Sequence, residues 1–118
     1  MTFSETTIYK ITTRTLWAQG TAEASLPPSP LDLEDGFMHF STASQLGETL
    51  RLYFAGRDDL VLCAVPLAGV AADLRWETSR DGALFPHLYG SLPMTAIAAH
   101  FQITVAEDGA CALPEGIA

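Results

Sequence analysis

An uninterrupted apolar segment at residues 60–67 constrains the fold more than any other feature of the sequence. It has the length of a strand and no polar face, which predicts a strand buried on both sides in the middle of a sheet. Residues 97–105 alternate instead between apolar side chains and polar or small ones. This period of two predicts an antiparallel strand with one face in water, and His100 lies on that face.

Four further segments have the composition of strands. They are residues 8–12, 37–42, 74–79 and 84–89. Residues 25–30 contain three prolines and residues 31–36 contain three acidic residues, so we expect a loop over 25–36.

Two helices are expected in the first half of the chain. One is capped by Thr13 or Thr15 and ends near Gly20. The other follows Thr42 and Gln45, which match a capping box, and ends at Gly56. About six strands and two helices, with the helices early and the strands late, predict the α+β class.

Composition and charge narrow the classes of function. The 118 residues fit a single domain, 1–118, with a loose tail at 109–118. A net charge of −8, with Lys10 as the single lysine, argues against a nucleic-acid partner, because such affinity comes largely from neutralised phosphates. No apolar run could span a membrane and no signal peptide is recognised, so the expected location is the cytoplasm. The oligomeric state is left open.

The candidate functional residues follow from the alternation of side chains along strands. Two segments each place a histidine beside an aromatic ring on one face, and a third places polar residues on one face. These faces hold Phe37, His39 and Ser41; Arg75, Glu77 and Ser79; and Phe85, His87 and Tyr89. If they line one cleft, aromatic walls with a few polar groups form a pocket for a small molecule. The histidines and the carboxylate could then do acid–base chemistry.

Each of these residues also has a structural interpretation. Either histidine could be a satisfied strand residue, and Glu77 could be a solvated position paired with Arg75 or Arg80. Tyr89 could belong to the core. Trp17 and Trp76 are expected in the core, and Asp32, Glu34 and Asp35 in a solvated acidic loop. Two histidines and a carboxylate can hold iron or zinc, but no close ligand pair occurs, so no metal is expected.

Two motifs carry a resemblance to a known family. They are Asp35-Gly-Phe-Met-His-Phe-Ser-Thr-Ala43 and Phe85-Pro-His-Leu-Tyr-Gly90. With them, the chain from Ile8 to about Phe101 resembles the small bacterial domain of unknown function 952 family. That family is similar in fold to the ADP-ribosyltransferase-like group, which clasps NAD between two small sheets. The resemblance implies about six strands in two small mixed or antiparallel sheets, with a cleft between them.

The resemblance also implies roles for particular residues. His39 would contact a ribose, Tyr89 or Phe85 would stack on nicotinamide, and Glu77 would stabilise oxocarbenium-like charge. The leading hypothesis is an NAD-using ADP-ribosyl transferase or NAD glycohydrolase that acts on a small molecule or a protein. Glu77 and His87 would be catalytic. The ligand-binding residues would be His39, Ser41, Ser79, Phe85 and Tyr89.

Two alternatives stay open. The chain could be a non-catalytic domain that binds or senses a small ligand such as a nucleotide. It could also be a hydrolase or lyase that acts on a phosphorylated metabolite, with His39 and His87 as an acid–base pair.

Overall fold

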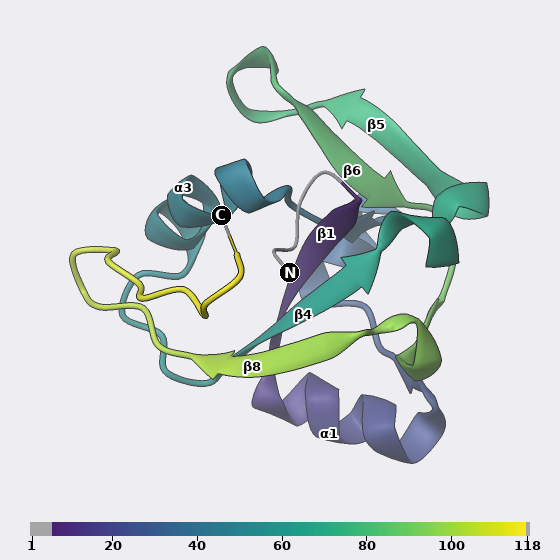
Figure 1. Cartoon of the computed structure of the whole chain (residues 1–118), viewed down its shortest axis with the longest axis horizontal. Coiled ribbons are helices and arrows are strands. Elements are labelled where there is room, and N and C mark those ends of the chain that lie inside the picture. Colours follow the sequence, from purple (N-terminus) through teal and green to yellow (C-terminus); the bar gives the residue numbers. More distant parts are fainter. Residues whose placement is uncertain (1–5, 118) are drawn as a thin grey trace.

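A three-stranded antiparallel sheet forms the centre of the computed structural model, which describes residues 6–117 (Figure 1). Its strands are β1 (Thr7–Thr13), β4 (Leu60–Pro66) and β8 (Ala99–Ile103), in the order β1-β4-β8. The apolar run therefore occupies the middle position, as the sequence predicts.

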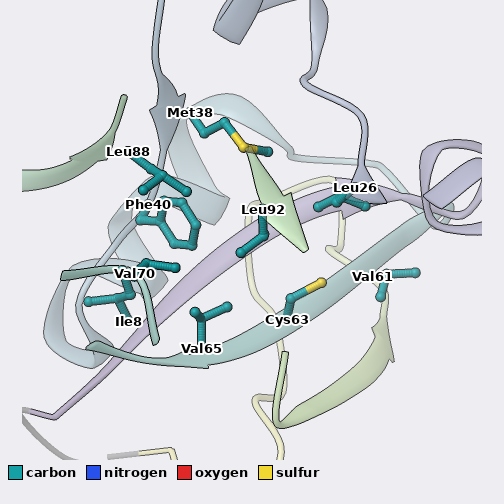
Figure 2. Packing of buried hydrophobic residues seen from close by; sticks show 10 residues of the cluster. All are labelled: Ile8, Leu26, Met38, Phe40, Val61, Cys63, Val65, Val70, Leu88 and Leu92. Carbon is teal, nitrogen blue, oxygen red and sulfur yellow. The ribbon is translucent and has the colours of Figure 1, made fainter. Parts of the chain in front are cut away.

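Both faces of β4 are buried, because side chains alternate along the strand. Val61, Cys63 and Val65 join the first hydrophobic core, together with residues from β1, β3, β6 and β7 (Figure 2). Leu60, Leu62 and Ala64 join the second core, to which helix α3 contributes Leu46 and Leu50. The central sheet thus lies between two cores.

A second antiparallel sheet has the order β3-β6-β5 and packs beside the central one. Its strands are β3 (Met38–His39), β6 (Leu84–Leu88) and β5 (Leu74–Thr78). A third sheet pairs β2 (Ser25–Leu26) with β7 (Leu92–Pro93). The expectation of about six strands in two sheets is therefore wrong: the described residues form eight strands in three small sheets.

The strand expected at 37–42 is divided between two sheets. Only Met38 and His39 pair with β6. Two residues later, Ser41 exchanges two backbone hydrogen bonds with Tyr9 of β1, at 2.8 and 2.9 Å. This extended segment is continuous in direction but changes partner, so it connects the second sheet to the central one.

Helices α1 (Arg14–Glu23) and α3 (Ala43–Tyr53) confirm the two expected helices, with shifted ends. Thr13 caps α1 by accepting a hydrogen bond from the Leu16 amide. Helix α3 begins with the predicted capping box, in which the Thr42 amide donates to Gln45 Oε1 at 3.0 Å. It ends at Tyr53, three residues before the expected Gly56.

A third helix, α2 (Pro30–Asp35), replaces part of the loop expected at 25–36. Ser29 accepts from the Asp32 amide at 3.2 Å, and the Ser29 amide donates to Asp32 Oδ2 at 2.9 Å. Pro30 fits the first turn, which needs no amide donor. Gly36, with φ of 84°, ends the helix in the left-handed conformation that glycine tolerates best. Three prolines concealed a capping box that was present in the sequence.

The two tryptophans differ in environment. Trp17 is half-buried against the first core and stacks on His100, with ring centroids 4.2 Å apart. Trp76, expected in the core, is wrongly assigned: it is 44% exposed on edge strand β5. Beyond β8, Cys111, Leu113 and Ile117 pack against the second core. In the part of the chain that the structure covers, no helix has the length and apolar character to cross a membrane.

Candidate functional site

A cavity of about 800 Å³ lies where β1, α2, α3 and the β5–β6 hairpin meet. Five of the residues singled out in the sequence line it. They are His39, Ser41, Ser79, Phe85 and His87. Glu77 and Tyr89 do not form its wall. Glu77 is hydrogen-bonded to His87, and Tyr89 is hydrogen-bonded to Glu77.

The two histidines come together because β3 and β6 pair in register. His39 lies directly opposite His87, and their ring centroids are 5.6 Å apart. Phe37 stacks on His87 at 4.0 Å and contacts His39 at 4.6 Å. Residues 48 positions apart in the chain thus form one aromatic cluster, and the phenyl ring of Phe37 restrains both imidazoles.

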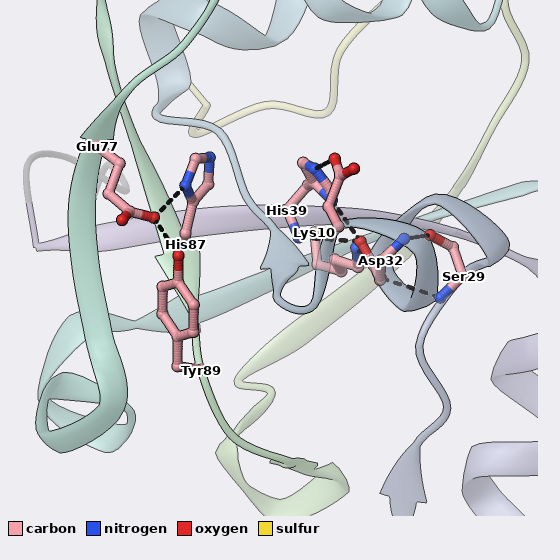
Figure 3. Close-up of polar contacts among 8 residues, drawn as sticks. Lys10, Ser29, Asp32, His39, Glu77, His87 and Tyr89 are labelled. Carbon is pink, nitrogen blue, oxygen red and sulfur yellow. Dashed lines mark hydrogen bonds and ion pairs between the residues drawn. The ribbon is translucent and has the colours of Figure 1, made fainter.

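His87 is oriented by a carboxylate on the neighbouring strand (Figure 3). Its Nδ1 lies 2.8 Å from Glu77 Oε1, and the Tyr89 hydroxyl donates to the same oxygen at 2.7 Å. These hydrogen bonds, first that of Tyr89 and then that of His87, lower the pKa of Glu77. An ionised carboxylate only accepts, so Nδ1 of His87 carries the hydrogen. Nε2 has no hydrogen-bond partner within residues 6–117.

The Tyr89 hydroxyl is also affected by this contact. Its hydrogen bond to Glu77 raises the pKa of Tyr89, because losing the proton would break the bond and place two negative charges together. Arg75 lies over the Tyr89 ring at 4.8 Å. Of the two rings expected to stack on a ligand, Tyr89 lies outside the cavity wall with Arg75 over it, whereas Phe85 lines the cavity.

His39 has a different environment from His87. Its Nδ1 lies 2.6 Å from Asp32 Oδ1, and its Nε2 lies 2.9 Å from Asp35 Oδ2. Both ring nitrogens of His39 are thus engaged by carboxylate oxygens. The two neighbouring imidazoles therefore differ: both nitrogens of His39 contact carboxylates, whereas one nitrogen of His87 has no hydrogen-bond partner within residues 6–117.

Asp32 is the buried centre of the polar network around His39 (Figure 3). Besides the His39 ring, it accepts from Lys10 Nζ at 2.7 Å, from the His39 amide at 3.0 Å and from the Ser29 amide. Burial acts to raise the pKa of Asp32, but the hydrogen bond from His39 and the charge of Lys10 outweigh it, and the pKa is held well below its usual range. Asp32 was expected in a solvated loop, and this expectation is wrong.

Lys10, the single lysine, is 3% exposed. Burial lowers its pKa, and the nearby Asp32 carboxylate opposes that change. The burial of a charge on β1 cannot be read from local sequence, because a lysine in an alternating strand normally faces water. The only sequence signal for this pair was the Ser29–Asp32 capping box, which places Asp32 at the start of a helix.

The cavity wall opposite α2 contains groups from α3 and the hairpin turn. Arg80 donates from Nη1 to Thr49 Oγ1 at 3.2 Å, and its guanidinium lies 5.0 Å from the centroid of the Phe85 ring. Thr49 Oγ1 also lies 3.5 Å from Ser41 Oγ. Arg80 and Thr49 were not identified as site residues in the sequence, because their contact joins residues 31 positions apart.

Within residues 6–117, no group of three or more His, Cys, Asp or Glu side chains is arranged to hold a metal ion. The carboxylates of Asp32 and Asp35 instead form hydrogen bonds with the ring of His39. The cavity wall contains an imidazole held by a carboxylate, a guanidinium, several hydroxyls and aromatic surface, which suits an organic molecule with polar substituents.

These features define a small α+β protein with a histidine-lined cavity. Residues 11–100 match the family described as "Protein of unknown function (DUF952)", and the chain belongs to that family. This confirms the family that the two motifs indicated. No curated protein matches the chain.

Solved structures of a bacterial protein show the same fold. The crystal structure of protein CC0527 from Caulobacter crescentus is 39% identical, with a TM-score of 0.85, over 91% of this chain and 94% of that one. A solution NMR structure of CC0527 is 40% identical, with a TM-score of 0.78, over 88% of this chain and 90% of that one. The likeness to the ADP-ribosyltransferase-like group stays a prediction.

Proposed function

We propose that this protein is an enzyme that acts on a small molecule in the cavity, with His87 as the group that accepts and donates the proton. The observation that carries the proposal is the 2.8 Å contact between Glu77 and His87 Nδ1 at the cavity wall. A carboxylate at Nδ1 holds the ring in one orientation and stabilises the imidazolium that forms during reaction. Nε2 is then the atom that exchanges the proton.

Glu77 acts in this proposal through His87. The sequence hypothesis had Glu77 stabilise charge on the substrate directly, but its carboxylate is bonded to His87 and Tyr89 and lies outside the cavity wall. We therefore assign Glu77 and Tyr89 as positioning residues. His39, Ser41, Ser79 and Phe85 are the ligand-binding residues of the proposal.

NAD is the substrate we propose, and the reaction is transfer or hydrolysis of its ADP-ribosyl group. The bond between the ribose anomeric carbon and the nicotinamide nitrogen breaks, and nicotinamide leaves with the electron pair. The anomeric carbon bonds to an oxygen of water, a small molecule or a protein side chain, and His87 Nε2 takes the proton of that oxygen. A cavity of about 800 Å³ lies within the range of ordinary ligand pockets.

The test is the release of nicotinamide from NAD, followed by chromatography. The wild-type chain should release it, and His87→Gln should lower kcat at least ~100-fold, which is within the usual contribution of acid–base catalysis. Glu77→Gln should lower kcat with little change in KM and alter its pH profile, because it affects only the orientation and charge of His87. His100→Gln is the matched control, since His100 lies outside the cavity, and it should keep full activity.

Calorimetry with NAD completes this test. Binding without nicotinamide release would favour the non-catalytic ligand-binding domain over the enzyme. If NAD neither binds nor releases nicotinamide, the choice of NAD as substrate is contradicted.

A second candidate is a hydrolase or lyase that acts on a phosphorylated metabolite. It is favoured by the cross-strand pairing of His39 with His87, since two neighbouring imidazoles, one of them with an open nitrogen, suit an acid–base pair. It predicts turnover of a phosphorylated substrate that His39→Gln and His87→Gln each abolish and that NAD does not affect.

A further inference from the structure

We propose that Arg80, in the turn between β5 and β6, binds a phosphate group of the substrate. This inference rests on the proposed function only in taking the cavity as the place where the substrate binds. It names a subsite separate from the two histidines, on the wall formed by α3 and the hairpin.

The distribution of charge on the cavity wall is the first reason. The chain has 6 basic and 14 acidic residues and is strongly negative. Its cavity wall reverses this balance, because it includes Lys10, Arg57 and Arg80 but only two carboxylates, Asp32 and Asp35. Half of the basic residues of an acidic protein thus gather around one cavity, which favours an anionic ligand.

The partners of these three cations are the second reason. Lys10 is neutralised by Asp32 at 2.7 Å, and Arg57 makes two hydrogen bonds of 2.8 Å to Asp59. Arg80 forms no ion pair with any carboxylate of residues 6–117, and its hydrogen bond goes to the neutral hydroxyl of Thr49. Among the three cations of the wall, Arg80 is thus the one without a carboxylate partner in the described residues.

The guanidinium of Arg80 is also held in place before any ligand arrives. Thr49 fixes one nitrogen, and the ring of Phe85 supports the guanidinium at 5.0 Å. The turn itself is closed by backbone hydrogen bonds from Gly82 to Ser79 and from Ala83 to Arg80, both 3.1 Å. A guanidinium has five N–H donors in a planar fork that matches phosphate oxygens, and one of them is used here.

Titration with inorganic pyrophosphate, followed by amide shifts in NMR spectra at constant ionic strength, tests the subsite. Arg80→Gln should weaken pyrophosphate binding at least ~10-fold, the usual scale for a lost charge-assisted contact. Arg75→Gln removes the same charge from the same chain and should stay within about 2-fold, because Arg75 lies outside the wall. Equal binding by Arg80→Gln and the wild type would overturn the inference.

Two more variants keep the test decisive. If Arg80→Gln does not fold, Arg80→Lys keeps the charge but loses the fork, and it should bind pyrophosphate several-fold more weakly; binding equal to the wild type would count against Arg80. Arg51→Gln removes an exposed charge outside the cavity wall and should bind pyrophosphate as the wild type does. If pyrophosphate binding depends on Arg80 but NAD is not turned over, the subsite is supported and the proposed enzymatic function is contradicted. If NAD is turned over but pyrophosphate binding does not depend on Arg80, the enzymatic function is supported and the subsite is contradicted.

Discussion

At the scale of single residues, Asp32 connects more of the site than any other side chain. It joins Lys10 of β1, the amide of Ser29 and both the amide and the ring of His39. Because the carboxylate is 2% exposed, all of these donors replace water that it has lost. The position of His39 therefore depends on Asp32, whose carboxylate binds the amide and the ring of His39.

Replacing Asp32 by Asn should lower the free energy of unfolding by about 3–5 kcal/mol, because Lys10 would be left as a buried charge without its counterion. Denaturant unfolding measures this change. Asp58→Asn is the control, since Asp58 is an exposed carboxylate, and it should change the value by less than about 0.5 kcal/mol. A loss below about 1 kcal/mol in Asp32→Asn would mean that the ion pair contributes no more than a surface pair.

At the scale of elements, the short helix α2 determines where the charged groups meet. A helix of six residues has little stability of its own, so its ends and its packing must hold it. Ser29 caps the first turn and Gly36 ends the last one. Within this one element, Asp32 and Asp35 lie one turn apart and contact the two nitrogens of the same imidazole.

Ser29→Ala should destabilise the chain by about 1 kcal/mol, the usual effect of losing a capping hydroxyl. The loss should be concentrated in α2, so amide hydrogen exchange of residues 30–36 should become faster than that of β4. Ser91→Ala, at an exposed serine outside any helix, should leave both measurements unchanged. Equal exchange of α2 in Ser29→Ala and wild type would show that packing alone holds the helix.

The elements also show what sequence could reveal. The apolar run of β4, the strand composition of β5 and β6, the period of two in β8 and the capping box of α3 are local signatures, and these predictions are confirmed. The two-residue strands β2 and β7 are too short to have a period. Helix α2 was not predicted, because the prolines next to it indicate a loop, although Ser29 and Asp32 form a capping box.

The site divides in the same way. Alternation along strands placed His39 and His87 each beside an aromatic ring, and the condition that these two faces meet holds in the structure, with the imidazole centroids 5.6 Å apart. Lys10, Asp32 and Arg80 were not identified, because their roles depend on which charges tertiary packing buries. Sequence patterns treat charged side chains as solvated by default.

At the scale of the whole molecule, one sheet with a core on each face supports the cavity at its edge. Most residues of the central strand are fully buried, so global unfolding exposes both cores together and a single cooperative transition is expected. The buried ion pair at the cavity breaks in that same transition. The stability of the whole chain should therefore report the titration of Asp32.

The stability advantage of the wild type over Asp32→Asn should shrink as the pH falls from about 5 to about 2. Folding lowers the pKa of Asp32 below the ordinary value of roughly 3.9, so the unfolded chain takes up the proton first. The contribution is complete above the unfolded pKa and is lost as the pH approaches the folded one. Urea unfolding of both proteins across this range measures the difference, and a constant difference would contradict the assignment.

The two backbone hydrogen bonds between Tyr9 and Ser41 have a consequence for ligand entry. They tie the segment that carries His39 to the central sheet, only two residues from that histidine. Spreading the two sheets apart would break both bonds, and no long hinge separates them at this point. We therefore expect the cavity to be preformed and to discriminate among ligands by shape rather than by closing around them.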